Sequence, residues 1–330
     1  MSENAAILIL TQNTIERKIY LKTTLYFLFK NFNNNYKYPI IILHEGDYME
    51  RDKIEIISGI RGNCKDLIKF KEIDKNDFEI PQHIDNNKLE RVVNTKIVPY
   101  WRNIKYRLMC NFWIKHFTKY TENYDYIMRL DDDSIIEEPI MIDLFKLLKE
   151  KNNIYMSNII HIDCGICNFE MKELFEKIIP NIDKNKLDKL FIKADINNTK
   201  EMYKKIKELY YIINDKEYDK EGSKEKITIN MPKMFYNNFF ITDVNFWKRK
   251  EVIDIINKID NSGNIFYYRY GDAPIQTLIV SLLESEKIAT VIFRYSKKLQ
   301  RECFIDLDNN IHSYMPNDYE HSSSIFNDVK

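Results

Sequence analysis

The N-terminal part of the chain alternates between continuous apolar runs and helical periodicity. The run Ala5–Leu10 is apolar throughout and is bounded by polar residues, which is typical of a strand buried on both faces. Apolar positions at helical spacing predict a helix over Ile15–Phe32. A second apolar run, Pro39–Leu43, predicts another buried strand, and Ile68–Ile73 predicts a more exposed one. This order of strand, helix and strand predicts a βαβ unit with parallel strands.

Further segments extend the same alternation. We expect helices over Asp52–Gly59 and over Lys105–Lys119, whose apolar and aromatic side chains share one face. Tyr124–Leu130 is predicted to form a strand, and three aspartates follow it directly. The pattern therefore predicts an α/β fold with a mostly parallel central sheet flanked by helices.

Composition and charge narrow the functional classes. Among 330 residues, 50 basic and 50 acidic side chains give a formal net charge of zero, which argues against a globally basic nucleic-acid-binding protein. No stretch approaches the roughly 18 apolar residues that a membrane-spanning helix needs. The five cysteines are scattered and odd in number, which favours a reducing compartment. We therefore expect a soluble cytoplasmic protein, or one of the secretory lumen if an anchor was removed.

The acidic triplet Asp131–Asp133 carries the strongest chemical signal. In an extended chain Asp131 and Asp133 project to the same side, at the carboxyl edge of the sheet where α/β proteins place ligands. Two carboxylates on one side suit Mg²⁺ or Mn²⁺, which would neutralise a diphosphate leaving group. The alternative is a solvated acidic turn that caps the next helix.

Three other segments hold candidate residues. Asp272, within Gly271–Pro274, precedes a predicted helix, and the local pattern alone favours an N-cap role for it. Asn237 and Asn238 lie among aromatic residues, where amides could bind sugar hydroxyls or simply form a turn beside a core strand. The segment Cys164–Cys167 has the spacing of a CxxC motif, but no second pair accompanies it. We expect these thiols to be packing residues.

Taken in order, these motifs resemble the fungal-type α-1,2-mannosyltransferases of glycosyltransferase family 15. The resemblance runs from about Ala5 to about Cys303, which is most of the chain. It is carried by the opening βαβ segment, the helix with Tyr106, the acidic triplet, and the segments Asn238–Trp247 and Gly271–Pro274.

The resemblance implies a GT-A glycosyltransferase-like fold, with a single catalytic domain over residues 1–308 and a polar tail over residues 309–330. It also implies retaining transfer of mannose from GDP-mannose onto a hydroxyl of a saccharide or glycoconjugate, with Mn²⁺ (or Mg²⁺) as cofactor. The expected partners are then a nucleotide-sugar donor and a glycan acceptor, without nucleic acid and without a membrane span.

The resemblance also implies roles for particular residues. Asp272 is expected to be catalytic, close to the reacting sugar or the acceptor hydroxyl. The expected metal ligands are Asp131 and Asp133. The residues expected to bind the donor are Tyr106, Arg129, Asp131 and Asn238.

Two positions depart from the family pattern. Phe240 stands where the family has a glutamate proposed as the catalytic carboxylate, and phenylalanine can neither attack nor accept a proton. The late histidine of the family's metal site has no obvious counterpart around Arg294–Leu299, where Ser296 occupies roughly its place, and His312 is the nearest downstream alternative. A catalytic member would then use a front-face route, with the leaving phosphate taking the acceptor proton, or assistance from Asp272. The alternatives are a non-catalytic member that binds a nucleotide sugar or a glycan, and an enzyme that uses a UDP-sugar.

Overall fold

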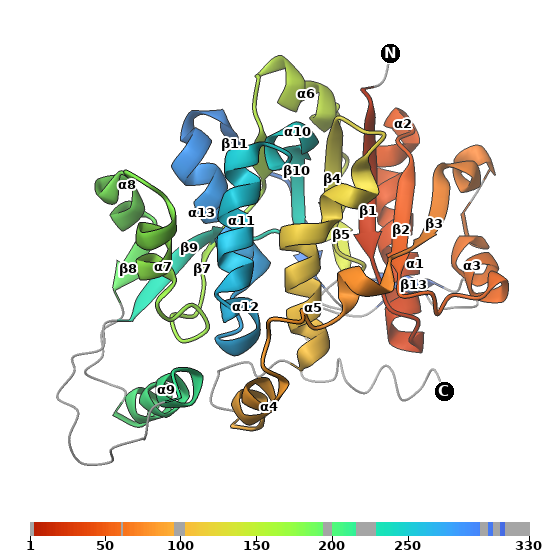
Figure 1. Ribbon diagram of the computed structural model, residues 1–330. Coiled ribbons are helices and arrows are strands. Elements are labelled where there is room, and N and C mark those ends of the chain that lie inside the picture. Colours follow the sequence, from red (N-terminus) through yellow and green to blue (C-terminus); the bar gives the residue numbers. More distant parts are fainter. Residues whose placement is uncertain are drawn as a thin grey trace.

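A seven-stranded sheet forms the centre of the molecule, within the residues that the computed structural model describes: 3–60, 62–95, 103–193, 200–215, 229–297, 303–305 and 311–313. Its strands are β1 (Ala5–Leu10), β2 (Ile40–His44), β3 (Ile68–Glu72), β4 (Tyr126–Leu130), β6 (Tyr155–Ser157), β10 (Phe239–Asp243) and β11 (Ile288–Thr290). They lie in the order β11-β6-β10-β4-β1-β2-β3 (Figure 1). Because only β10 runs antiparallel to its neighbours, the predicted mostly parallel sheet is confirmed.

Each face of the sheet has its own hydrophobic core, because side chains alternate along every strand. In β1, Ala6 and Leu8 belong to one core, whereas Ala5, Ile7 and Ile9 belong to the other. The first core is covered by α5 (Ile104–Asn111), α7 (Met171–Ile178), α11 (Lys250–Asn261), α12 (Asn264–Tyr267) and α13 (Asp272–Glu284). The second is covered by α1 (Ile15–Leu28), α3 (Glu50–Ile57) and α6 (Leu144–Glu150). Burial on both faces explains the continuous apolar runs in the sequence.

The predicted elements are present in the expected order, but two helices are less regular than expected. The segment Lys105–Lys119 was expected to form a single helix, yet α5 is followed by a π-helical turn, Phe112–His116, and a 3-10 turn, Phe117–Thr121. Trp113, in the π-helical turn, is buried. The predicted helix Ile15–Phe32 is also divided, because α1 is followed by a π-helical turn, Phe29–Asn33.

Smaller elements complete the described part of the chain. The remaining helices are α2 (Asn34–Tyr36), α4 (Asn86–Asn94), α8 (Lys184–Lys189), α9 (Lys200–Ile213) and α10 (Val244–Trp247). The short strands are β5 (Ser134–Ile136), β7 (Ile160–Ile162), β8 (Phe191–Lys193), β9 (Asn230–Phe235), β12 (Tyr295–Lys297), β13 (Cys303–Ile305) and β14 (Ile311–Ser313). The last of these, β14, falls within the predicted tail, whose other residues lie outside the described ranges, so the boundary at residue 308 stays a prediction.

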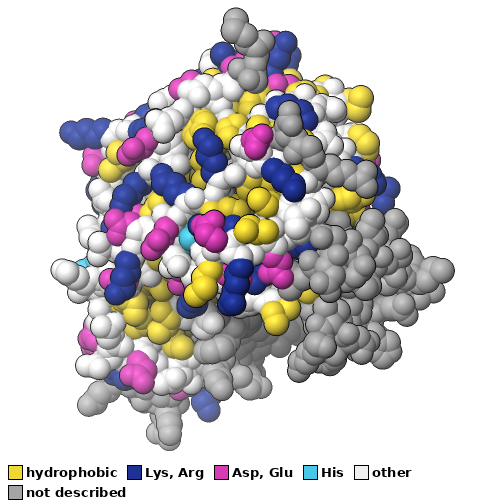
Figure 2. Space-filling model, turned by 90° about the vertical axis from the view of Figure 1, so that its right-hand side faces the viewer, with side chains coloured by type: hydrophobic (Ala, Val, Ile, Leu, Met, Phe, Trp, Pro, Cys, Tyr) yellow, Lys and Arg dark blue, Asp and Glu magenta, His cyan; other side chains and the backbone are white. Residues whose placement is uncertain are grey.

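The surface carries mixed charge. On the face seen in Figure 2, basic and acidic side chains are interspersed with apolar ones. The edge strand β3 exposes Lys69, Lys71 and Glu72, and charged side chains on an edge strand discourage pairing with another chain. None of the helices in the described ranges has both the length and the apolar character needed to cross a membrane.

Candidate active site

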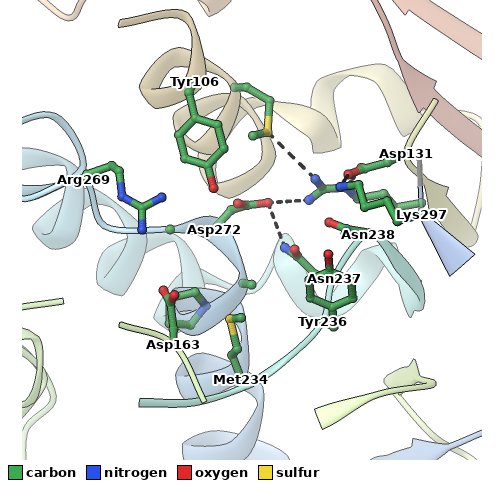
Figure 3. A pocket seen from close by; sticks show the side chains of 15 residues that line it. Tyr106, Asp131, Asp163, Met234, Tyr236, Asn237, Asn238, Arg269, Asp272 and Lys297 are labelled. Carbon is green, nitrogen blue, oxygen red and sulfur yellow. Dashed lines mark hydrogen bonds and ion pairs between the residues drawn. The ribbon is translucent and has the colours of Figure 1, made fainter. Parts of the chain in front are cut away.

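A cavity of about 250 Å³ lies where β4 ends, next to the start of β10 and the first turn of α13. Five of the six predicted site residues line it, and Figure 3 shows Asp272 between Arg269 and Lys297. The structure therefore brings together residues that the sequence separates widely. The lining residues are Tyr106, Met109, Arg129, Asp131, Asp163, Met234, Tyr236, Asn237, Asn238, Arg269, Gly271, Asp272, Ala273, Pro274 and Lys297.

Asp272 is a buried member of the cavity wall and not a helix cap. Gly271 is the N-cap of α13, and the side chain of Asp272 makes no capping hydrogen bond, so the N-cap role predicted from the local pattern is wrong. Its Oδ2 accepts a hydrogen bond from Nδ2 of Asn237 at 2.8 Å and is paired with the guanidinium of Arg129. A buried guanidinium needs a carboxylate partner, and this need directs the side chain of Asp272 inward.

Arg129 connects Asp272 to the acidic triplet. Its Nε donates to Oδ1 of Asp131 at 3.0 Å, while its Nη1 is paired with Asp272. The guanidinium carbon lies 4.2 Å from the centroid of the Trp113 ring, a cation–π contact. Two carboxylates and one aromatic ring thus hold the fully buried Arg129 in a fixed orientation. This arrangement suits a residue that positions acidic groups around a ligand.

The acidic triplet forms a turn, so the extended geometry expected from the sequence is wrong. The strand β4 ends at Leu130, and the N–H of Ser134 donates to the carbonyl of Asp131 at 3.0 Å, which closes the turn. The N–H of Asp131 donates to the carbonyl of Asn238 at 2.9 Å, which ties the turn to the start of β10. Asp131 and Asp133 still approach each other, because both lie next to the side chain of Lys297.

The surroundings of Asp131 and Asp132 shift the pKa values of these two carboxyl groups in opposite directions. Burial alone would raise the pKa of Asp131, but the positive charges of Arg129 and Lys297 outweigh it and hold this pKa below its ordinary value. For Asp132, burial prevails over the attraction of Arg17 and raises the pKa to about 7. Asp132 accepts hydrogen bonds from Thr11 at 2.7 Å and Arg17 at 2.8 Å. Asp132 therefore ties the turn to the N-terminal βαβ unit.

The predicted metal ligands do not fit a divalent metal as they are arranged. Nζ of Lys297 lies 3.0 Å from Oδ2 of Asp131 and 3.5 Å from Oδ1 of Asp133, and Asp133 also lies 3.4 Å from Nη1 of Arg17. A metal bound by both carboxylates would lie close to this ammonium, and like charges repel strongly in a buried site. Within the part of the chain that the structure describes, no group of three or more His, Cys, Asp or Glu side chains could hold a metal ion.

Two hydrogen-bond donors in the cavity wall have no hydrogen-bond partner among the residues that the structure describes. They are Nδ2 of Asn238 and Nε of Arg269, and both side chains are more than nine-tenths buried. Arg269 also has a left-handed backbone, with φ of +70°, which is strained for a residue with a Cβ. Its guanidinium carbon lies 5.4 Å from the centroid of the Tyr106 ring. Buried donors without partners are costly, so this wall is suited to a ligand rich in hydrogen-bond acceptors.

Phe240 belongs to the core and does not line the cavity. Its ring is stacked on Tyr155, with 5.2 Å between the ring centroids, and contacts Trp113 edge to face. Phe240 lies opposite Arg129 in the pairing of β10 with β4, and its ring centroid is 6.0 Å from the guanidinium carbon. At this position the chain presents an apolar ring and no carboxylate.

Sequence reasoning missed two cationic side chains of the cavity. Lys297 shows no local signal, because it enters the site through the antiparallel pairing of β12 with β5, in which it lies opposite Ser134. Arg269 stands three residues before Asp272, and an arginine so close to a candidate acid was the one signal available. Asp163, whose Oδ2 accepts from Asn168 at 2.8 Å, was also missed.

Comparison with known proteins identifies relatives over most of the chain. The model of the family described as glycolipid 2-alpha-mannosyltransferase matches residues 1–317. Probable mannosyltransferase KTR3 of Saccharomyces cerevisiae is 29% identical over 256 residues, which cover 76% of this chain and 56% of that protein. The O-glycoside alpha-1,2-mannosyltransferase omh1 of Schizosaccharomyces pombe is 26% identical over 258 residues, which cover 77% and 58%. The chain thus spans less than two thirds of the length of these curated relatives.

Solved structures agree with the predicted GT-A fold. The mannosyltransferase Ktr4p of S. cerevisiae, solved in complex with GDP, matches with a TM-score of 0.71 at 19% identity, over 89% of this chain and 71% of that chain. Core-mannan synthase A (CmsA/Ktr4) of Aspergillus fumigatus, solved in a Mn/GDP form, matches with a TM-score of 0.69 at 18% identity, over 95% and 79%. The fold and the family match together confirm the resemblance, and the chain belongs to the glycolipid 2-alpha-mannosyltransferase family.

Proposed function

We propose that this chain is a retaining mannosyltransferase that transfers mannose from GDP-mannose to a hydroxyl of a saccharide or glycoconjugate. Membership of the family supports this proposal, since the curated relatives are named mannosyltransferases. The GDP bound to Ktr4p supports a guanine nucleotide as the carrier of the sugar. The partners of the chain would then be a nucleotide-sugar donor and a glycan acceptor.

The observation that carries the proposal is the setting of Asp272. Its carboxylate faces the cavity from the first turn of α13, fixed by Asn237 and Arg129, and through Arg129 it is coupled to Asp131. The same wall offers the partnerless donors of Asn238 and Arg269. A single cavity thus combines an oriented carboxylate with donors for phosphate and hydroxyl oxygens, which is what glycosyl transfer from a nucleotide sugar requires.

The arrangement favours a front-face reaction. The bond between the anomeric carbon and the phosphate oxygen breaks, and the acceptor oxygen forms its bond to that carbon on the same face. The acceptor proton passes to the departing phosphate oxygen. Asp272 would orient the acceptor hydroxyl and stabilise positive charge on the sugar. A double displacement through position 240 has no nucleophile, because the core ring of Phe240 stands there. The Mn/GDP form of core-mannan synthase A supports the Mn²⁺ (or Mg²⁺) expected from the resemblance, but Asp131 and Asp133 as arranged do not fit it, and no step depends on it.

The test is a transfer assay with several donors. The protein is incubated with methyl α-mannoside and, in separate reactions, with GDP-mannose, UDP-glucose or UDP-galactose, and the acceptor is analysed by mass spectrometry. We expect the addition of one hexose with GDP-mannose alone, and loss of the product in Asp272→Asn. A product formed from a UDP-sugar would support glycosyl transfer but contradict mannose as the transferred sugar.

The second candidate is a non-catalytic member that binds a nucleotide sugar or a glycan. Phe240 favours it, because the chain lacks a carboxylate at the position where the family has its proposed catalytic glutamate. The two candidates differ in one observable. The non-catalytic protein would bind GDP or a glycan in a titration and yet form no product with any donor or acceptor.

A further inference from the structure

The ammonium of Lys297 occupies the position between the two carboxylates that were predicted to bind metal. Its Nζ lies 3.0 Å from Asp131 and 3.5 Å from Asp133. The pairing of β12 with β5 holds it there, since Lys297 lies opposite Ser134, the residue that follows Asp133. Two carboxylates within 3.5 Å of this nitrogen favour the charged form of the lysine.

Each carboxylate of the acidic turn already has a cationic partner. Asp131 is paired with Arg129 and Lys297, Asp132 with Arg17, and Asp133 with Arg17 and Lys297. Together with Asp272, which shares Arg129, four carboxylates face three cationic groups. A dication at this turn would have to displace one of these partners.

Lys297 also lines the cavity, where a ligand can reach it. An ammonium has three N–H donors, and one of them forms the hydrogen bond to Oδ2 of Asp131, whereas the contact with Asp133 at 3.5 Å is an ion pair. Within the described residues, a donor therefore remains for a ligand oxygen. The same cavity holds the partnerless donors of Arg269 and Asn238, which independently indicate an acceptor-rich ligand such as a diphosphate.

We propose that Lys297 is a resident cation that contacts the diphosphate of the donor, and that this chain binds its nucleotide-sugar donor without a divalent metal. The proposal rests on the proposed function, since it needs a nucleotide diphosphate in the cavity. Lys297 would stabilise the negative charge that grows on the leaving phosphate as the glycosidic bond breaks. Because the pairing of β12 with β5 fixes Lys297, its positive charge is present in the site without binding of a metal ion from solution.

The test is a calorimetric titration of the full chain with GDP, in EDTA and in Mn²⁺. We expect the two dissociation constants of the wild type to agree within about threefold. Lys297→Met should weaken GDP binding by about tenfold or more under both conditions, because a hydrogen bond to a charged group is lost. Lys297→Arg, which keeps the charge, should stay within about fivefold of the wild type. Circular dichroism and thermal melting of each variant verify folding.

Lys18→Met is the matched control. Lys18 also bridges two carboxylates, Asp52 at 2.6 Å and Glu55 at 3.0 Å, but it does not line the cavity. Its loss should lower stability and leave GDP binding unchanged.

Two results would overturn the proposal, and they differ in what they leave standing. GDP binding by the wild type that requires Mn²⁺ would overturn the role of Lys297 and keep the proposed function. The comparison of GDP binding by the wild type in EDTA and in Mn²⁺ tests the proposal even if Lys297→Met does not fold. Absence of GDP binding to the folded wild type under both conditions would overturn the role of Lys297 and the use of a GDP-sugar together.

Discussion

The carboxylate of Asp272 is the single group on which the proposed chemistry depends most. In Asp272→Asn we expect kcat for mannosyl transfer to fall by about 100-fold or more, because the amide carries no charge toward the sugar or Arg129. The affinity for GDP should change by less than about threefold. Initial rates over a range of donor concentrations, together with a GDP titration, measure both quantities.

Asp243→Asn controls for the loss of an aspartate elsewhere. Asp243 caps α10 by accepting from the N–H of Asn245 and does not line the cavity. Its kcat should match that of the wild type. An Asp272→Asn variant with the full transfer rate would remove Asp272 from the mechanism.

Cys164 is expected to be the reactive thiol among the described cysteines. A hydrogen bond from the thiol of Cys167 lowers the pKa of Cys164 to about 6, and the side chain is half-buried. The thiolate fraction therefore rises through pH 6 and is nearly complete above pH 7. Alkylation by iodoacetamide, followed by peptide mass spectrometry, should reach a plateau above pH 7. A rate that still climbs between pH 8 and pH 9 would contradict the lowered pKa.

At the scale of elements, β10 contributes Phe240 to the core and not to the reaction. Phe240→Leu removes the stacking on Tyr155 and the contact with Trp113, so we expect the free energy of unfolding to fall by about 1 kcal/mol. The folded variant should keep kcat within about threefold. Urea unfolding measures the change in the free energy of unfolding, and initial transfer rates measure the change in kcat. A large fall in kcat at unchanged stability would indicate that Phe240 acts in the site.

Some of the elements were predictable from the sequence, and others were not. Strands such as β1 and β2 are recognisable because burial on both faces demands continuous apolar runs. The shape of the acidic turn was predicted wrongly, because it depends on a hydrogen bond to Asn238, in the turn that precedes the distant strand β10. Lys297 could not be placed at all, since it meets Asp131 across 166 positions of sequence. Local pattern also misassigned Asp272, whose direction is set by Arg129.

At the scale of the whole molecule, the sheet should show a gradient of stability from its centre to its edges. The strands β1 and β4 are paired on both sides and lie between two cores, whereas β3 is an edge strand with exposed charged side chains. Hydrogen exchange followed by mass spectrometry should therefore find the slowest amides in β1 and β4 and faster ones in β3. Equal protection in β3 and β1 would contradict this order.

The fold and the family of the whole chain were predictable, because the motifs follow one another in the family's order over most of its length. The extent of the catalytic domain and the cellular location of the protein are not tested by the family match. The domain boundary at residue 308 and the cytoplasmic location stay predictions. Charge excluded a globally basic protein, and the mixed surface in Figure 2 agrees with that inference.

Proton NMR of the transfer reaction tests the central claim most directly. GDP-mannose and methyl α-mannoside are mixed with the wild type, and the anomeric signals of donor and product are followed in time, with Asp272→Asn as the inactive control. We predict that an α-linked dimannoside forms as the α-linked donor is consumed, which is transfer with retention. A β-linked product would contradict the front-face reaction, and consumption of the donor without any disaccharide would contradict transfer itself.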